Sequence, residues 1–462
     1  QIIESKDKDG ELIEKLRKVQ WRQDSLNNLF RRENPKYHRL KIEKEVATVA
    51  KLREKVLNRD LEKVMIEFFW GEKTLNIIAI NASDFKMYAL SLEACDLPEQ
   101  VRLLREGLRK QQPFADLATA QFKLYQTLLA PILEGETALK NANKIRRLFL
   151  IPDGPLRGIP FAALRTSPPN ESGKPGEKAL LLYKYSTAYQ FSSTLLLENI
   201  QQDQKLAQNE GNFRSLYAYA PDFKQEMPST TIFPEQKFPA LIATGKALDQ
   251  LVERYPSRYF KGEQATEASF KALAEQSLVL YLNTHGLLHD SLPLHSGIIF
   301  SPDTQEDGIL YTRELFSMSL NTRLVILGAC NTGYGQAQPG ESQMSLSRGF
   351  TYAGCPSMLT SLWEQYDGAS ASITTDFLRF LEDGLGKDIA LQRAQIKYLS
   401  KSDHFGDQPQ YWAQMIIGGS VAPLPLKPAR KSWPFLLGIS LALCIVGGPL
   451  LFFSVLNQKR YK

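Results

Sequence analysis

The chain has 462 residues, of which 43% are hydrophobic and 23% are charged, and its formal net charge is +6. This length suffices for more than one folded core, and the composition is that of a globular protein. The positive charge is small and has no basic stripe interleaved with aromatic residues, so we expect no direct binding to nucleic acid. The four cysteines fit neither a metal-binding spacing nor a disulfide framework, so a reducing compartment is expected. Because the chain begins at Gln1 rather than at methionine, we expect a piece of a longer protein or a processed one.

Residues 1–60 are rich in charge and carry apolar residues at helical spacing. Leu12, Leu16 and Val19 recur at i, i+4 and i+7, and Pro35 divides the segment into two halves. We therefore predict an antiparallel helix pair. Two interpretations of this pair stay open, a solvated amphipathic cap or the end of a helical repeat array.

The pattern then changes to that of strands, followed by helices and a further strand. Strands are predicted at 64–70, 74–81, 85–90 and 148–151, with helices between 98 and 143. Polar loops are predicted at 165–178 and around 201–212.

Beyond residue 212, strands and helices alternate. Strands are predicted at 215–220, 278–286, 296–301, 323–330 and 357–363, and helices at 246–254, 266–275, 342–353 and 369–383. Apolar strands that alternate with helices favour a mostly parallel α/β sheet. In such a sheet the functional residues collect at the carboxyl ends of the strands.

The C-terminal region contains an uncharged apolar run. Residues 433–456 would span about 36 Å as a helix, more than the roughly 30 Å of a bilayer's hydrocarbon core. Basic residues flank the run on both sides, and Trp433 is suited to the membrane interface. We predict a Pro-rich spacer at 422–432, a transmembrane helix at 433–456 and a basic tail at 457–462. The flanking charges are balanced and do not predict the orientation.

Two residues at predicted strand ends have the chemistry of a thiol nucleophile and its base. Cys330 follows the strand "RLVILGAC", and His285 follows "LVLYLNTHG", 45 residues earlier. Neighbouring parallel strands end at the same edge, so the two side chains are expected to face one crevice. His285 would take the proton of Cys330, and the N–H groups of Gly286 and Cys330 would form an oxyanion hole.

Each residue also has a simpler interpretation. A single cysteine at a strand end is more often a small core residue, and a single histidine a satisfied polar one. Cys355 is predicted to be such a core residue. A metal site from His285, His289 and His295 is a weaker alternative, because the glutamate of the zinc-peptidase motif is missing.

The segments "LNTHG" and "VILGACNTGYG" resemble those of CHAT domains, a caspase-clan peptidase family that is also similar to separase. The resemblance extends to "LFLIPDGPLRGIPFAAL", to the segment that starts at "LSRGFTYAGC", and to "YWAQMIIGG", and covers residues 61–421. It implies a caspase-like three-layer α/β sandwich that comprises a catalytically empty lobe at 61–212 and an active lobe at 213–421. It also implies a cysteine endopeptidase with His285 as base and Cys330 as nucleophile, without a cofactor.

The residues that would select the substrate are less well defined. Relatives that prefer basic residues carry an acid two positions before the cysteine, where this chain has Gly328. Four other acids are candidates for the specificity pocket: Asp290, Glu341, Glu364 and Asp367. Asp367 matches an acid that often follows "SLW" in the family, and that acid has either a pocket role or a structural one.

The resemblance implies a protease with protein substrates, and the apolar run predicts that it is anchored in a membrane, with a cytoplasmic globular part. CHAT domains commonly follow tetratricopeptide repeats, and some members are bacterial defence proteases, so a protein activator is expected to engage the N-terminal helical region. The main alternative is a non-catalytic signalling scaffold with the same fold. Another thiol hydrolase that uses the same cysteine and histidine is a third possibility.

Overall fold

The computed structural model of the chain describes residues 46–109, 114–169, 179–208, 214–223, 238–274, 277–287, 292–328, 346–363, 366–402 and 408–429, with residues 19, 21, 22, 25 and 289. The chain divides into two compact units, residues 1–427 and 428–462. All helices and strands named below belong to the first unit.

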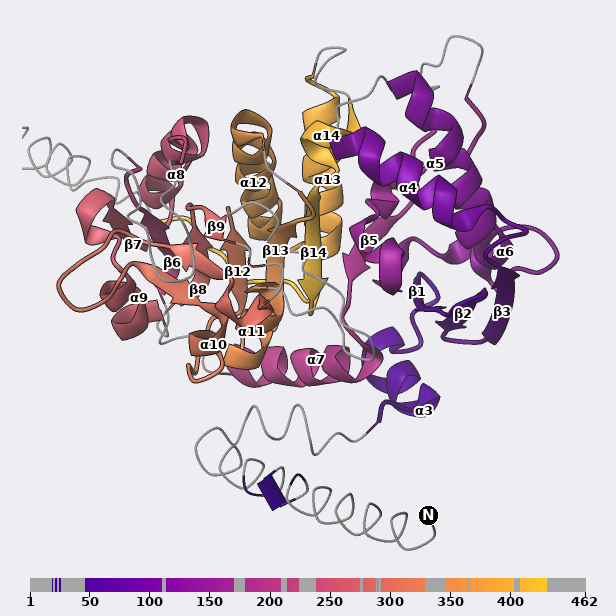
Figure 1. Ribbon diagram of the computed structural model, residues 1–462, viewed down its shortest axis with the longest axis horizontal. Coiled ribbons are helices and arrows are strands. Elements are labelled where there is room, and N and C mark those ends of the chain that lie inside the picture. The colour runs from indigo at the N-terminus through magenta and orange to yellow at the C-terminus, as the bar shows by residue number, and fades with distance from the viewer. Residues whose placement is uncertain are drawn as a thin grey trace, which may run out of the picture. The chain divides into compact units, whose positions relative to one another are not determined.

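The strands of the described residues form a large sheet and a small one (Figure 1). The large sheet consists of β1 Lys63–Trp70, β2 Thr74–Asn81, β3 Phe85–Ser91, β4 Arg147–Ile151, β5 Ser186–Tyr189, β6 Arg214–Ala220, β7 Ser257–Lys261, β8 Ser277–Leu282, β12 Leu324–Leu327, β13 Ser357–Ser361 and β14 Met415–Gly419. Their order in space is β3-β2-β1-β4-β5-β14-β13-β12-β8-β6-β7. The small sheet consists of β9 Gly286–Leu287, β10 Gly297–Ile299 and β11 Ile309–Tyr311.

The helices lie between these strands in the sequence. They are α3 Val49–Leu52, α4 Leu97–Arg109, α5 Phe114–Leu128, α6 Ala130–Leu133, α7 Ser193–Ala207, α8 Ile242–Arg254, α9 Glu267–Leu273, α10 Thr312–Leu315, α11 Leu346–Ala353, α12 Asp367–Glu382, α13 Lys387–Leu399 and α14 Pro409–Trp412. A π-helical turn, η1, covers Arg53–Leu57, and short 3-10 turns are η2 Ala142–Lys144, η3 Gly154–Gly158, η4 Phe161–Ala163, η5 Leu181–Tyr183, η7 Gly262–Gln264 and η9 Pro293–His295.

The large sheet is parallel except at three pairs of strands. β1 pairs antiparallel with β2, β2 with β3, and β13 with β14. Because β14 is parallel to β5 but antiparallel to β13, the two halves of the sheet run in opposite directions. The carboxyl ends of β8 and β12 therefore lie at the opposite edge from those of β4 and β5.

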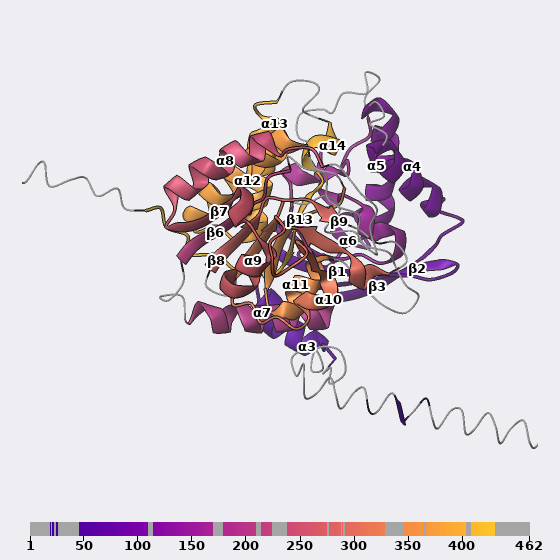
Figure 2. The same cartoon turned by 60° about the vertical axis from the view of Figure 1, so that its left-hand side comes forward.

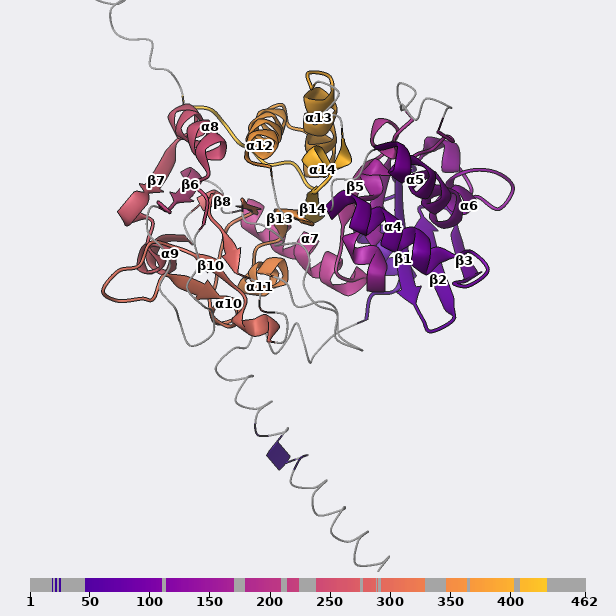
Figure 3. The ribbon, with the colours of Figure 1, turned by 45° about the horizontal axis from the view of Figure 1, so that its top comes forward.

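Helices cover both faces of the sheet, which gives three layers. Successive residues of β12 show this, because Leu324 and Ile326 belong to one buried cluster and Val325 and Leu327 to another. The first cluster includes residues of α8, α12 and α13, which lie side by side in Figures 1 and 3. On the other face, α4 and α5 pack over the first half of the sheet (Figure 2), and α9 and α11 over the second half. The predicted α/β fold with a large, mostly parallel sheet is confirmed.

Most of the predicted elements are present. The predicted strand at 74–81 coincides with β2, and the predicted helix at 369–383 corresponds to α12. Cys355 is fully buried, as predicted for a core residue. The division into lobes at 212 and 213 stays a prediction.

The predicted polar loop around 201–212 is wrong for its first part. Residues 201–207 continue helix α7, whose N-cap Ser192 accepts a hydrogen bond from the Leu195 N–H. The polar composition is misleading here because Asp203 and Leu206 are buried while the residues between them face solvent. This polar stretch is therefore the amphipathic end of a helix.

The predicted N-terminal helix pair and the C-terminal membrane segment lie largely outside the described residues. From residue 46 onward the lead-in forms α3 and η1, which end at Asn58 and Arg59 in left-handed conformation. No helix among the described residues is long and apolar enough to cross a membrane, and residues 433–456 are not among them. Leu424 and Leu426 are buried, so the first part of the predicted spacer packs against the core.

Candidate active site

The candidate site lies where β8 and β12 end, next to each other and parallel. Leu324 pairs with Val279 and Leu327 with Leu282, a constant offset of 45 residues. The Gly328 N–H then donates to the Leu282 carbonyl oxygen at 2.8 Å. The same offset separates His285 from Cys330 in the sequence. The strand register therefore aligns the end of β8 with the end of β12, where both chains leave the sheet.

Gly328 packs closely against β8, so a side chain at this position would require the backbone of β8 to shift. A Cβ atom there would lie 3.0 Å from the Leu282 carbonyl oxygen and 3.3 Å from the Asn283 Cα. Position 328 therefore supplies no acid to a specificity pocket, which agrees with the departure from basic-specific relatives that the sequence shows.

His285 is buried and held by a backbone carbonyl. It lies between β8 and β9 with 6% of its surface exposed. Its Nε2 is 2.8 Å from the carbonyl oxygen of Pro239. Two aromatic rings pack against the imidazole, Phe223 edge-on at 4.6 Å and Phe238 at 5.1 Å between centroids. These contacts fix the plane of the ring.

The contact with Pro239 also selects the tautomer of His285. A carbonyl oxygen only accepts, so the hydrogen bond requires that Nε2 carries the proton. In the neutral imidazole Nδ1 then holds the lone pair. The contact with Pro239 thus fixes the orientation of the imidazole as well as its tautomer.

The backbone around His285 is fixed by β10. The Ile299 N–H donates to the His285 carbonyl oxygen at 3.0 Å, and Leu287 pairs with Gly297. Gly286 lies opposite Ile298 between these pairs. In an antiparallel ladder such an intermediate pair is not hydrogen-bonded, so the Gly286 N–H points away from β10. This orientation is compatible with a donor in an oxyanion hole.

Asp367 connects two helices. Its carboxylate accepts hydrogen bonds from the Ala243 N–H at 2.6 Å and the Thr244 N–H at 2.9 Å, and from the Thr244 hydroxyl. Helix α8 begins after Leu241, which has no side chain able to cap it. Asp367 therefore supplies the missing N-cap from the first turn of α12. These contacts give the residue a structural role, and its part in a specificity pocket stays a prediction.

The other predicted site residues lie outside the described residues. These are Cys330, Asp290, Glu341 and Glu364. Conversely, the sequence did not indicate Phe223, Phe238 or Pro239 as neighbours of His285. They belong to the connection between β6 and α8, and no local pattern associates them with a histidine about 50 residues later.

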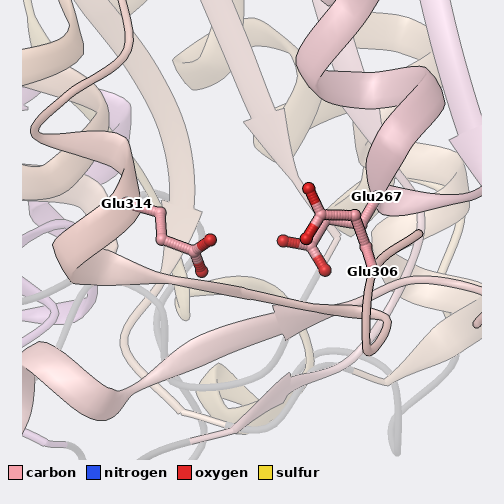
Figure 4. A group of neighbouring side chains, drawn as sticks. All are labelled: Glu267, Glu306 and Glu314. Atoms are coloured by element: carbon pink, nitrogen blue, oxygen red, sulfur yellow. The ribbon is translucent and has the colours of Figure 1, made fainter.

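The described residues bring three potential metal ligands together only at Glu267, Glu306 and Glu314, and not at the histidines. The three carboxylates point toward one another (Figure 4). Lys271 Nζ contacts all three, at 2.8 Å from Glu267, 2.9 Å from Glu306 and 2.8 Å from Glu314. An ammonium group thus already occupies the centre of this cluster and offsets part of its negative charge. Burial raises the pKa of Glu267 to about 7, against the opposing effect of Lys271.

His289 and His295 are not arranged with His285 as metal ligands. Their ring centroids are 6.3 Å apart with the planes nearly perpendicular. Burial and the nearby charges of Arg313 and His289 lower the pKa of His295. The Leu292 N–H donates to His289 Nδ1, which ties this ring to its own loop.

Comparison with solved structures shows which known folds this chain resembles. The chain is similar to separase in the separase–securin complex of Saccharomyces cerevisiae, with a TM-score of 0.50 and 10% sequence identity. The match covers 80% of this chain and 31% of the separase chain, so the chain spans about a third of that protein. The Arg-specific cysteine proteinase gingipain R matches at a TM-score of 0.35 and 8% identity, over 72% of this chain and 70% of the other. No curated protein sequence matches the chain.

The large, mostly parallel sheet gives the protein a mixed α/β fold that is similar to that of separase. Its family follows from the sequence itself, because the model of the CHAT domain family matches residues 119–420. The chain belongs to the CHAT domain family. The matched range begins later than residue 61, where the resemblance of the sequence motifs begins.

Proposed function

We propose that the protein is a cysteine endopeptidase in which Cys330 is the nucleophile and His285 the general base. The observation that carries this proposal is the shared offset of 45 residues between β8 and β12 and between His285 and Cys330. Cys330 follows Gly328 by two residues, and two residues of extended chain reach at most about 7 Å. The register of the sheet therefore supports the pairing of Cys330 with His285.

The proposed mechanism uses the tautomer that Pro239 imposes. His285 Nδ1 accepts the thiol proton of Cys330, and the thiolate attacks the carbonyl carbon of the scissile peptide. The N–H groups of Gly286 and Cys330 stabilise the oxyanion. His285 then returns the proton to the leaving amine, and water releases the acyl group from the cysteine sulfur.

Cleavage profiling by mass spectrometry tests this proposal. A diverse peptide library is exposed to the full chain, to Cys330→Ala and to His285→Ala, with Cys95→Ala as a control that removes a partly buried thiol elsewhere. We expect cuts from the full chain and from Cys95→Ala, and none from the other two variants. Cuts that persist in Cys330→Ala would contradict the proposal. A Cys330→Ala chain that keeps every cellular effect would favour the signalling scaffold, and a changed side chain without a cut would favour another thiol hydrolase.

We propose further that the protein is anchored by a transmembrane helix at 433–456, with its globular part in the cytoplasm. The support is the uncharged apolar run with basic flanks. Extraction of membranes with alkaline carbonate tests the anchor. The full chain is expected to stay in the pellet and a chain that ends at residue 432 in the supernatant. Release of both would contradict the anchor.

We propose that a protein partner activates the protease by binding the N-terminal helical region. Such an activator is expected for a CHAT domain that follows tetratricopeptide repeats. The pathway is proposed to be one of bacterial defence or regulation. A physical route exists, because Leu52, Val56 and Leu57 at the end of this region are buried in the central core cluster. A displacement of the lead-in would therefore act on the face of the sheet. Full-speed cleavage by the purified chain alone would contradict this dependence on a partner.

A further inference from the structure

A second cavity lies away from the candidate active site, among segments that are far apart in the sequence. Its volume is about 440 Å³, within the range of roughly 300–1,000 Å³ that is typical of small-molecule sites. It is lined by η1, by the first residues of β1 and β4, by α7, and by the segment 420–423 that follows β14. The wall thus combines the N-terminal lead-in with the C-terminal end of the core.

One part of the wall is apolar. Phe149, Leu196, Ile200 and Val56 line the cavity, and all except Ile200 are buried residues of the central core cluster. An apolar ring or chain that displaced water from this part would gain about 25 cal/mol for each Å² of apolar surface buried.

The rest of the wall is basic. Arg147 forms a two-pronged ion pair with Asp388, with Nε at 2.8 Å and Nη2 at 2.6 Å from the carboxylate oxygens. Within the described residues this leaves Nη1 of Arg147 for a further acceptor. Lys63, also on the wall, has a longer contact of 3.3 Å with Asp60. Both side chains are largely buried, with 16% and 17% exposed.

Asp203, which lines the cavity, is paired with buried cations. Asp203 accepts from Arg323 Nε at 2.5 Å and from Lys387 Nζ at 3.3 Å, and these three side chains are nearly fully buried. The Ser420 hydroxyl donates to the same carboxylate at 2.6 Å. One carboxylate is therefore shared by two buried cations. Burial lowers the pKa of Lys387 to about 8, although Asp203 opposes this shift.

Counting the buried groups gives an unbalanced charge. Arg147, Arg323 and Lys387 carry three positive charges, whereas Asp203 and Asp388 carry two negative ones. The N-terminus of α13 adds its partial positive charge, because its N-cap residue Gly386 also lines the cavity. Each of these cations has a partner, but of the charged residues that line the cavity four are basic and one is acidic, so an anion is favoured there.

We propose that this cavity binds a small organic anion, with a phosphate or carboxylate group against Arg147 and Lys63 and an apolar part against Phe149, Leu196 and Ile200. The proposal does not depend on peptidase activity. It assigns a ligand site to the side of the core where the N-terminal lead-in and the C-terminal segment meet.

Isothermal titration calorimetry of the full chain in detergent, at low salt, tests the proposal with three probes. Phenyl phosphate presents both the anion and the ring, inorganic phosphate only the anion, and phenol only the ring. We expect phenyl phosphate to bind more tightly than either of the other probes, and its affinity to fall as salt is added. An absence of phenyl phosphate binding, or equal binding of phenol, would overturn the proposal.

Two substitutions on one helix locate the site. Gln204 is an exposed residue of α7 that lines the cavity, and Gln201 is an exposed residue of α7 that does not. Gln204→Glu adds a negative charge without removing an ion pair. Two like charges 4 Å apart in water repel each other by roughly 1 kcal/mol, so phenyl phosphate binding should weaken about fivefold. Gln201→Glu should leave the affinity unchanged. Equal effects of the two substitutions would place the anion elsewhere and refute the assignment.

A third variant tests the role of Lys63 while its folding is checked separately. Lys63→Gln removes a wall cation but keeps a polar side chain of similar length, and its thermal unfolding is recorded without ligand. A native unfolding transition with weakened phenyl phosphate binding supports the site. A native transition with unchanged binding contradicts the role of Lys63.

Discussion

Replacement of Asp367 by asparagine tests whether this acid stabilises the fold or selects the substrate. The carboxylate accepts two backbone N–H groups at the start of α8 and the Thr244 hydroxyl. Loss of an N-cap costs about 0.5–2 kcal/mol, and hydrogen bonds to a charged group contribute about 1.5–3 kcal/mol each. Asparagine keeps one oxygen as an acceptor but loses the charge and the second acceptor. We expect the free energy of unfolding to fall by about 2 kcal/mol.

The effect on catalysis should be indirect and uniform. Helix α8 begins three residues after Pro239, whose carbonyl orients His285. Loosening the start of α8 should therefore lower kcat/KM by the same factor for all substrates, whatever residue precedes the scissile bond. The control is Asp383→Asn, an exposed acid at the C-terminal end of α12, where the loss of negative charge should be neutral or slightly stabilising.

Urea unfolding followed by circular dichroism gives the stability, and cleavage of substrates that differ only before the scissile bond gives the selectivity. A stability within about 0.5 kcal/mol of the unmodified chain, together with a changed substrate preference, would refute the capping argument and favour a pocket role for Asp367.

Three further predictions concern the energetics of the core and of the acidic cluster. Asp203→Asn leaves two buried cations without their carboxylate. It should lower the free energy of unfolding, measured by urea titration, by about 3–5 kcal/mol. A loss below about 1 kcal/mol would contradict the contribution of this buried network. Because the pKa of Glu267 is raised from 4.5 to about 7, the folded state binds its proton more tightly than the unfolded state, so stability from this group falls as pH rises from about 4.5 to 7. Between pH 4.5 and 8, the free energy of unfolding of Glu267→Gln should therefore decrease less than that of the unmodified chain, by up to about 3 kcal/mol. The same pH dependence in both chains would refute this prediction. Gly419 and Gly384 both have φ near +80°, but a Cβ at Gly419 would lie 2.0 Å from the Pro356 carbonyl oxygen, whereas nothing lies within 4 Å at Gly384. Gly419→Ala should therefore lower the thermal unfolding temperature much further than Gly384→Ala. Similar decreases would indicate that the positive φ, and not the overlap with Pro356, causes the loss of stability.

The periodicity of the sequence predicted those elements that bury a regular face. The hairpin strands β1 to β3 and the helix α12 were predicted close to their observed bounds, because their apolar residues recur with the period of the element. The short strands β5 and β7 were not predicted. They have only 4 and 5 residues, and β7 has no continuous apolar run.

The helix α7 was missed in part because its buried face includes a charged residue. Asp203 is buried against cations that come from residues 323 and 387, more than a hundred positions later. A local pattern cannot indicate that such an aspartate faces inward. The same limit applies to Asp367, whose hydrogen-bond donors lie 123 and 124 positions earlier in the sequence.

The prediction for the candidate site relied on the parallel arrangement of two strands. The pairing of β8 with β12 confirms the arrangement that brings the predicted strand ends together. The partner of His285 was not predictable, because the Pro239 carbonyl belongs to the backbone and its side chain carries no chemical signal. A backbone acceptor that orients a histidine can be identified only when the fold is known.

The central position of β14 determines when during synthesis this protein can complete its fold. β14 is the last strand of the described chain, yet it lies between β5 and β13 and joins the two halves of the sheet. Until residue 419 has left the ribosome, β5 and β13 each expose an unpaired edge, and such edges promote association with other chains. The nascent chain therefore carries the open edge of β5 from residue 189 onward and that of β13 from residue 361 onward, and closes both only when β14 inserts.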